Sequence, residues 1–481
     1  MIKKLNFWYD KHAIKNANRV YKWEWAILIA FALAMLCTSI YNDILITSRQ
    51  SLIFLDCVAS GKPMSFFLEA FNSVTGVATY NVPQSASYPI TFYVIFAVWN
   101  LPLWLIQRFT GKDVLISIPG MIWIQLILVL AVFLALREFY LILKDNEKTK
   151  NYAELGCFLF ASSALVLVSV FIMGGYEIMT IFIMLAAIRA WLKDDWKKFL
   201  IFSMIAVSLK YFALLYFVPL VLLKEKRFFR IIGMGIASVL LSLVSMVFPK
   251  PKASTPLTLK LLKVFTNDAA VKLGEERCLQ IFVIVVIIAF MWAFITKPKK
   301  EEELHYAVFF LMIIMGAFTT FADIHYYWSV LAVPVLIMAI LLSSGNMNKS
   351  LILETVAVGA YTVKSFLMRG SMTRIELFTT MKIIPKIFNL NVPLFEVDDS
   401  LAFKLERMEM KTLFVLVSFL EAVTICCIFA MIYLCKPGRK KIDVLEPLNG
   451  FVVKGRAIAN MGLTLVPMAF YVLYFIFIYE S

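Results

Sequence analysis

Long stretches of apolar residues alternate along this chain with short segments that carry most of its charged side chains. Many of the stretches are close to twenty residues long, which is what an α-helix needs to cross a hydrocarbon core of ~30 Å. Backbone groups inside a bilayer must bond within their own helix, so the pattern predicts an all-α polytopic membrane protein with about thirteen transmembrane helices. The expected spans are 25–41, 116–143, 152–172, 177–192, 198–209, 211–223, 229–248, 280–296, 304–322, 326–343, 350–366, 410–435 and 457–478, and 88–107 is a further apolar stretch.

Basic residues in the short connections predict which side of the membrane each connection faces. Connections rich in Lys and Arg alternate with less basic or longer ones, and the positive-inside rule places the basic ones in the cytoplasm. The first span follows a basic amphipathic N-terminus and has no small-residue cleavage site after it, so we expect a retained span with the N-terminus inside. The basic groups are Lys193/Lys197/Lys198, Lys224/Lys226/Arg227/Arg230, Lys297/Lys299/Lys300 and Lys436/Arg439/Lys440/Lys441.

Lys210 interrupts the apolar run from Phe199 to Leu223. Because the basic groups on both sides of this run are expected inside, the run must turn back at Lys210 and cross twice. Each arm then has about twelve residues, or ~18 Å, so Lys210 lies at a sunken turn that faces outward. A lysine at bilayer depth costs roughly 2.5–3.5 kcal/mol on insertion scales and normally lies in a cavity beside an anionic partner. Lys210 is therefore a candidate ligand-binding residue.

The stretch 88–107 does not fit this topology as a full span. If segment 42–87 and the turn at Gly174 both face outward, then 88–107 and the two apolar stretches after it cannot all cross. Asn100 and Pro102 interrupt the stretch, which favours a partial or in-plane segment, although the opposite assignment stays open. Within the first outer loop, residues 48–59 show the pattern of a short helix lying in the membrane interface.

Composition supports a membrane protein and narrows the partners. Hydrophobic residues make up 61% of the chain and charged residues 16%, while the net charge of +15 is scattered over the connections. Topology and anionic lipid explain this charge better than a nucleic-acid partner does. The sequence has no Gly-rich phosphate loop, GxSxG elbow, CxxC or HExxH, which disfavours a nucleotide-driven reaction inside the cell, and no metal or other cofactor is inferred.

Two outward carboxylates are candidates for chemistry. Asp43 directly follows the first span, and a carboxylate at the outer surface can take a proton from an acceptor hydroxyl as a general base; alternatively it is a solvated group that closes a helix. Glu177 follows Gly174 and Gly175 and enters the first turn of the next helix, where a negative charge is electrostatically favoured. Glu177 has either a functional role or only the structural role of a favourable first-turn residue.

A third outward turn, Phe321 to Trp328, combines Asp323 and His325 with the aromatic residues Tyr326, Tyr327 and Trp328. Such a turn can present a donor for phosphate and rings that stack on sugars. Against this, tyrosine and tryptophan belts are ordinary at membrane interfaces.

The order of these features resembles the GT-C superfamily of integral-membrane glycosyltransferases. The resemblance covers about residues 25–250, whereas the rest is similar only in architecture. In those enzymes an acidic residue follows the first span, a tyrosine-proline segment begins an apolar stretch, and a lysine ends a short helix. The matching segments here are Asp43, Tyr88-Pro89-Ile90-Thr91-Phe92-Tyr93, Gly174-Gly175-Tyr176-Glu177 and Ser208-Leu209-Lys210-Tyr211-Phe212-Ala213-Leu214 before Pro219.

This resemblance implies a catalytic membrane module at 1–250 and a variable membrane module at 251–481. It also implies transfer of a sugar, with inversion, from a polyprenyl-monophosphate donor such as an undecaprenyl phosphate sugar to a glycan or lipid acceptor. The reaction would take place on the extracytoplasmic face of the plasma membrane. By resemblance, Asp43 is the catalytic base, Lys210 and His325 bind the donor phosphate, and Glu177, which stands where many members have aspartate, joins Asp323 and Tyr88 in the sugar pocket.

Other classes of membrane protein also need many spans and a buried cation. A transporter or flippase for lipid-linked oligosaccharides should show inverted repeats with paired interruptions, and the C-terminal half has no counterpart of Lys210. A polysaccharide ligase or polymerase that uses pyrophosphate-linked glycans shares the same cavity requirements. A purely structural role is the remaining alternative.

Overall fold

The computed structural model describes residues 20–73, 86–251, 270–272, 278–322, 324–343, 346–368, 378, 381, 383–387, 410–438 and 448–474. Nearly all regular structure in these ranges is helical, which confirms the all-α class. A short antiparallel pair is the exception, in which β1 (Ala270–Lys272) lies beside β2 (Cys278–Gln280).

Six helices in the described ranges are long and apolar enough to cross a bilayer. They are α5 (Ile90–Thr110), α6 (Ile118–Lys144), α12 (Phe228–Leu243) with η5 (Val244–Met246), η6 (Lys300–Glu302) with α15 (Glu303–Phe321), α17 (Met347–Met368) and α21 (Met410–Leu434). Two bent pairs raise the number to eight. The first joins α2 (Lys22–Thr38) to α3 (Asn42–Ala59) at 70°, and the second joins Lys150–Ala161, which ends in α7 (Ala153–Ala161), to Ala164–Ile172 at 48°.

The expectation of about thirteen transmembrane helices, each near twenty residues, is not confirmed. Apolar composition does not determine where a helix ends, and several of the expected spans form helices that are too short to cross the hydrocarbon core alone. These are α9 (Glu177–Leu192), α10 (Trp196–Leu209), α11 (Leu214–Lys224), α14 (Ile281–Ile295) and α16 (Val333–Leu342). A long last helix, α22 (Gly450–Tyr474), carries charged residues in its first turns.

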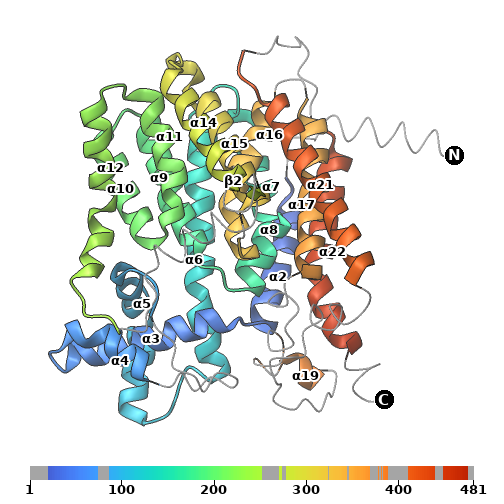
Figure 1. Cartoon of the computed structure of the whole chain (residues 1–481). Coiled ribbons are helices and arrows are strands. Elements are labelled where there is room, and N and C mark those ends of the chain that lie inside the picture. Colours follow the sequence, from blue (N-terminus) through green and yellow to red (C-terminus); the bar gives the residue numbers. More distant parts are fainter. Residues whose placement is uncertain are drawn as a thin grey trace.

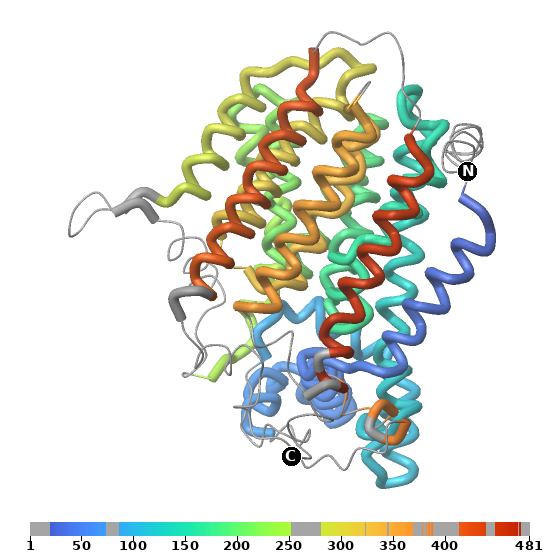
Figure 2. Tube along the Cα trace, turned by 90° about the vertical axis from the view of Figure 1, so that its right-hand side faces the viewer, coloured from blue at the N-terminus to red at the C-terminus, as the bar shows by residue number. Residues whose placement is uncertain are grey.

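The helices stand side by side in a bundle, and α3, α4 (Phe66–Asn72) and α5 gather at one end of it (Figures 1 and 2). The helix expected at 48–59 is part of the longer α3. Asn100 and Pro102 do not interrupt α5, contrary to the expectation, because the helix continues through both. Buried Asn100 donates a hydrogen bond to Ser51 Oγ of α3 at 3.0 Å, so its polarity is partly satisfied by this packing.

Three of the basic groups meet at the opposite end of the bundle. Lys224 Nζ lies 2.5 Å from Asp194 Oδ1, and Lys300 pairs with the same carboxylate. Lys226 Nζ donates to the carbonyl of Thr296 at 2.9 Å. Since α10 begins and α11 ends at this end, the chain reverses direction between them, which confirms the turn predicted at Lys210.

An ion pair ties the last helix to the interior of the bundle. Arg456 of α22 binds both carboxylate oxygens of Glu354 of α17 at 2.6 Å, and both side chains are buried. A third nitrogen of Arg456 donates to Ser162 Oγ at 3.1 Å. Ser162 lies at the break between α7 and α8 (Ala164–Val166), so one arginine links three segments that are distant in sequence.

Most buried apolar side chains form one continuous cluster that runs from Val20 in the first described segment to Tyr471 in α22, and a smaller cluster gathers around Phe66, Phe67 and Tyr93. Large apolar side chains also cover outward faces of the helices, as Ile287, Ile288 and Ile295 do on α14. Burying such faces against hydrocarbon is favourable, whereas exposing them to water is not. The chain is therefore a multi-pass helical membrane protein.

Candidate functional site

Lys210 lies where α10 ends. Its backbone is extended, with φ −150° and ψ 121°, although its N–H still bonds to the carbonyl of Ala206 at 2.9 Å. One 3-10 turn, η4 (Tyr211–Ala213), then leads into α11. The break sends the Lys210 side chain into the protein, where the residue is only 8% exposed.

A carboxylate and three aromatic rings surround the Lys210 ammonium group. Its Nζ lies 2.6 Å from Glu177 Oε1, and Glu177 is 1% exposed. The same nitrogen lies 5.0 Å from the ring centroid of Tyr88, 5.5 Å from that of Tyr176 and 4.9 Å from that of Trp328. Cation–π contacts are worth ~2 kcal/mol or more when they are desolvated. The expected anionic partner of Lys210 is therefore Glu177, held beside it inside an aromatic cage.

Glycines position Glu177. Gly174 has a φ of +57°, which side chains with a Cβ rarely adopt. A Cβ on Gly175 would lie 2.7 Å from the carbonyl oxygen of Ser169 and 3.3 Å from Glu177 Oε2. The turn thus brings backbone against carboxylate at the first residue of α9, and Oε2 accepts no hydrogen bond from a described residue.

Asp43 also lies near Tyr88. It is half-buried in the first turn of α3, where Tyr327 donates a hydrogen bond to its Oδ2 at 3.3 Å. Burial raises the pKa of the Tyr88 hydroxyl well above its ordinary value, and the nearby carboxylates of Asp43 and Glu177 raise it further. The hydroxyl of Tyr176 donates a hydrogen bond to that of Tyr88. Both carboxylates therefore act on the same phenol, although they come from different helices.

His325 borders this group of residues and is exposed. Its ring stacks on Tyr327 with 5.3 Å between centroids and meets Trp328 edge-on at 4.9 Å. Tyr327 bonds Asp43 and Trp328 covers Lys210, so His325 stands between the two halves of the site. Asp323 lies outside the described residues.

The structure thus brings together Asp43, Tyr88, Glu177 and Lys210, with His325 at their edge. The rings of Tyr327 and Trp328 were expected at most to stack on a sugar, and their contacts with Asp43 and Lys210, like that of Tyr176 with Lys210, were not predicted from the sequence. The available signal was their position, since each is adjacent in sequence to, or two or three residues from, a candidate charged residue.

An apolar cavity of about 470 Å³ lies next to the site between α5, α6, α9 and α10. Its wall includes Leu209, the residue before Lys210, and the stacked pair Trp99 and Trp123. Each indole of this pair donates to the other residue's carbonyl, at 3.0 and 3.2 Å, which satisfies both polar groups. The cavity can therefore accept a long apolar group whose polar end lies near Lys210.

Among the described residues, no cluster of three or more His, Cys, Asp or Glu side chains could hold a metal ion. Comparison with protein-family models, with curated proteins and with solved structures found no match for this chain. Fold and surface define a multi-pass membrane protein, and the candidate site is the feature that bears on its function.

Proposed function

We propose that this protein is an integral-membrane glycosyltransferase. It transfers a sugar from a polyprenyl-monophosphate donor to a glycan or lipid acceptor at the cell surface, with inversion, on the extracytoplasmic face of the plasma membrane. The N-terminus and the basic connections then face the cytoplasm. The observation that carries the proposal is a caged lysine and two carboxylates at one end of the bundle, directly beside an apolar cavity.

The donor fits this combination of surfaces. A polyprenyl tail is apolar and fills the cavity beside Leu209, while its phosphate reaches the ammonium group of Lys210. A preorganised cation in a dry site stabilises the charge that develops on a leaving phosphate. Because Glu177 already pairs with Lys210, the phosphate must displace this carboxylate or share the lysine with it. His325, exposed at the edge of the site, supplies a second contact to the phosphate.

Asp43 supplies the base in this mechanism. Its carboxylate takes the proton from an acceptor hydroxyl as the hydroxyl oxygen bonds to the anomeric carbon of the sugar. The bond between that carbon and the phosphate oxygen breaks on the opposite face, and the electron pair leaves with the polyprenyl phosphate on Lys210. Glu177 Oε2, which accepts no hydrogen bond from a described residue, receives one from a sugar hydroxyl, and the rings of Tyr88 and Trp328 border the sugar.

A transporter of lipid-linked oligosaccharide is the second candidate. The breaks at Ser162 and Lys210 favour it, because discontinuous helices often form substrate sites in transporters. A transporter binds the same donor but does not cleave it.

Donor binding is tested first by native mass spectrometry of the protein in nanodiscs against a panel of polyprenyl-phosphate hexoses. We expect selective retention by the wild type and a loss of more than ten-fold in Lys210→Ala, because a charge-assisted contact is worth about 1.5–3 kcal/mol. Lys364→Ala is the matched control, since Lys364 pairs with Glu421 between α17 and α21. Equal losses in both variants would contradict a phosphate site at Lys210.

Sugar transfer is tested with a radiolabelled donor selected in that panel. Asp43→Asn should abolish release of polyprenyl phosphate while donor retention persists. Asp56→Asn is the control, because Asp56 lies on the same helix but is exposed and bonds only to α5 in the described structure. Full turnover by Asp43→Asn would refute the base, and intact donor moved across the bilayer would favour the transporter.

A further inference from the structure

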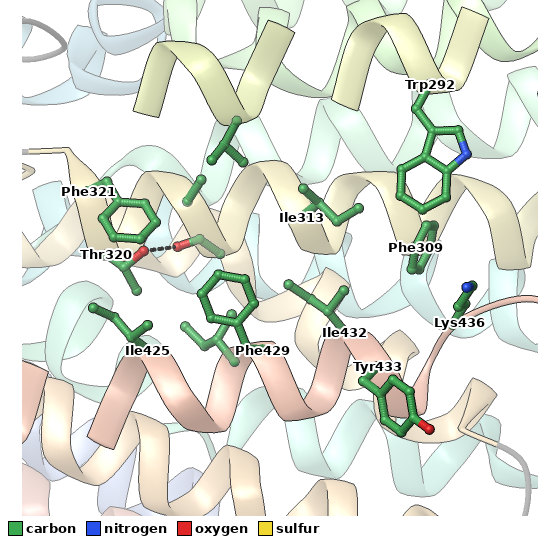
Figure 3. Close-up of a pocket in the computed structure, with 14 residues that line it drawn as sticks. Trp292, Phe309, Ile313, Thr320, Phe321, Ile425, Phe429, Ile432, Tyr433 and Lys436 are labelled. Carbon is green, nitrogen blue, oxygen red and sulfur yellow. Dashed lines mark hydrogen bonds between the residues drawn. The ribbon is translucent and has the colours of Figure 1, made fainter. Parts of the chain in front are cut away.

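A second groove lies between α14, α15 and α21 (Figure 3), and its lining includes no residue of the candidate site. It has a volume of about 350 Å³. Trp292 of α14, Phe309 and Ile313 of α15, and Phe429 and Ile432 of α21 form its walls. These side chains have no polar atom to offer except the indole N–H, so the groove selects an apolar occupant.

The dimensions of the groove match one leaflet of a bilayer. Its lining on α15 extends from Phe309 to Phe321, which is about 18 Å at 1.5 Å per residue. Half of a hydrocarbon core is roughly 15 Å. Thr320, a polar residue near the end of α15 that leads into the turn at Phe321, donates a hydrogen bond to the carbonyl of Gly316 at 2.8 Å and needs no external partner. A single acyl chain therefore fits along the groove.

A cation lies at the other end of the groove, which is the basic end of the bundle. Lys436 follows α21, is exposed and forms no ion pair with a described residue. The preceding residue is anchored, because its carbonyl oxygen lies 2.7 Å from the ring nitrogen of His305. Tyr433 and Trp292 line the groove near the same end, at the level where aromatic residues meet lipid headgroups. Exposed Lys297 and Lys299 belong to this end of the bundle as well, so they add positive charge near Lys436.

We propose that this groove binds an anionic phospholipid of the leaflet at the basic end of the bundle. One acyl chain lies between α14, α15 and α21, and the headgroup phosphate pairs with Lys436. Charge complementarity supports this occupant over a zwitterionic lipid, because the ammonium group has no protein anion to neutralise it among the described residues. The inference is independent of the proposed glycosyl transfer, since no residue of the groove belongs to the candidate site.

The test is native mass spectrometry of the detergent-solubilised full chain with phosphatidylglycerol or phosphatidylcholine of identical acyl chains. We expect the wild type to retain phosphatidylglycerol at least three-fold more than phosphatidylcholine. Lys436→Gln should reduce this preference at least three-fold, whereas Lys349→Gln, an exposed lysine at the same end but outside the groove, should leave it unchanged.

A second pair of variants tests the acyl chain. Ile313→Trp fills the groove and should lower retention of both lipids, whereas Ile287→Trp places the same side chain on the outward face of α14 and should not. Equal retention of the two lipids by the wild type would overturn the proposal. So would equal effects of the two lysine variants, or a dimer that Ile313→Trp dissociates, because the groove would then be an interface between copies of this chain.

Discussion

Removing Lys210 should destabilise this protein more than removing Glu177, and removing both should cost less than removing Lys210 alone. Lys210→Met leaves the Glu177 carboxylate buried without its cation, and breaking a buried pair in this way costs about 3–5 kcal/mol. Glu177→Gln keeps an amide oxygen that can accept from Lys210, and the three rings still surround the ammonium group. The expected loss is then the charge-assisted part of one hydrogen bond, about 1.5–3 kcal/mol.

The double variant Lys210→Met/Glu177→Met distinguishes the contribution of the Lys210–Glu177 ion pair from that of side-chain packing. Replacing a buried ion pair by apolar residues of similar volume is often neutral, so we expect its stability to lie near that of the wild type. Lys364→Met is the reference, because its pair with Glu421 is partly exposed, at 20% and 25% for the two side chains. A partly exposed pair should be worth no more than about 1 kcal/mol.

Reversible unfolding by sodium dodecyl sulfate in mixed micelles, followed by tryptophan fluorescence, measures these differences. Trp328, one of ten tryptophans in the chain, contacts Lys210 and contributes to this signal. The reasoning is refuted if Lys210→Met costs no more than Lys364→Met, or if the double variant loses as much as the sum of the single ones. Either result would mean that the carboxylate and the ammonium group do not depend on each other.

Three further predictions follow from contacts described above. Gly175→Ala forces a Cβ against a backbone carbonyl and should lower both stability, by about 1–3 kcal/mol, and donor retention; unchanged values in the same assays would contradict the tight turn. Tyr327→Phe removes the hydrogen bond to Asp43 and should slow sugar transfer roughly 2- to 12-fold without changing donor retention, as single-turnover assays would show. Arg456→Met should cost about 3–5 kcal/mol, and adding Glu354→Met should recover most of the loss; equal instability of single and double variants would argue against the pair.

Charge determined which parts of the topology were predictable. The turn at Lys210 followed from basic groups on both sides of one apolar run, and the structure brings Lys224 and Asp194 together at one end. Span number was not predictable in this way, because apolar residues do not indicate whether a helix bends. The 70° bend after Thr38 and the short α9 and α10 depend on tertiary packing.

In the candidate site, the charged residues were predictable from the sequence, whereas their contacts were not. Asp43, Glu177 and Lys210 stood out because charged residues beside apolar runs are costly and therefore conspicuous. Their pairing was not predictable, since the contact of Lys210 with Glu177 depends on how α10 packs against α9. The ring of Trp328 could not be assigned either, because a tryptophan at an interface has the same sequence signature whether it faces lipid or a buried lysine.

The ion pair of Arg456 with Glu354 sets an order of events during synthesis. The two residues are 102 positions apart, so at 5–20 residues per second the arginine emerges about 5–20 s after the glutamate. Until then the carboxylate has to stay in water or find another polar partner, because an unpaired charge in the bilayer is costly. Ser162 precedes Arg456 by 294 positions, so it lacks its hydrogen bond to the same guanidinium for even longer. The segment around Ser162, which precedes Glu177 in the sequence, therefore reaches its final contacts only when α22 packs against it. A nascent chain stalled before Arg456 would lack this contact, although Ser162 lies in the N-terminal half of the chain.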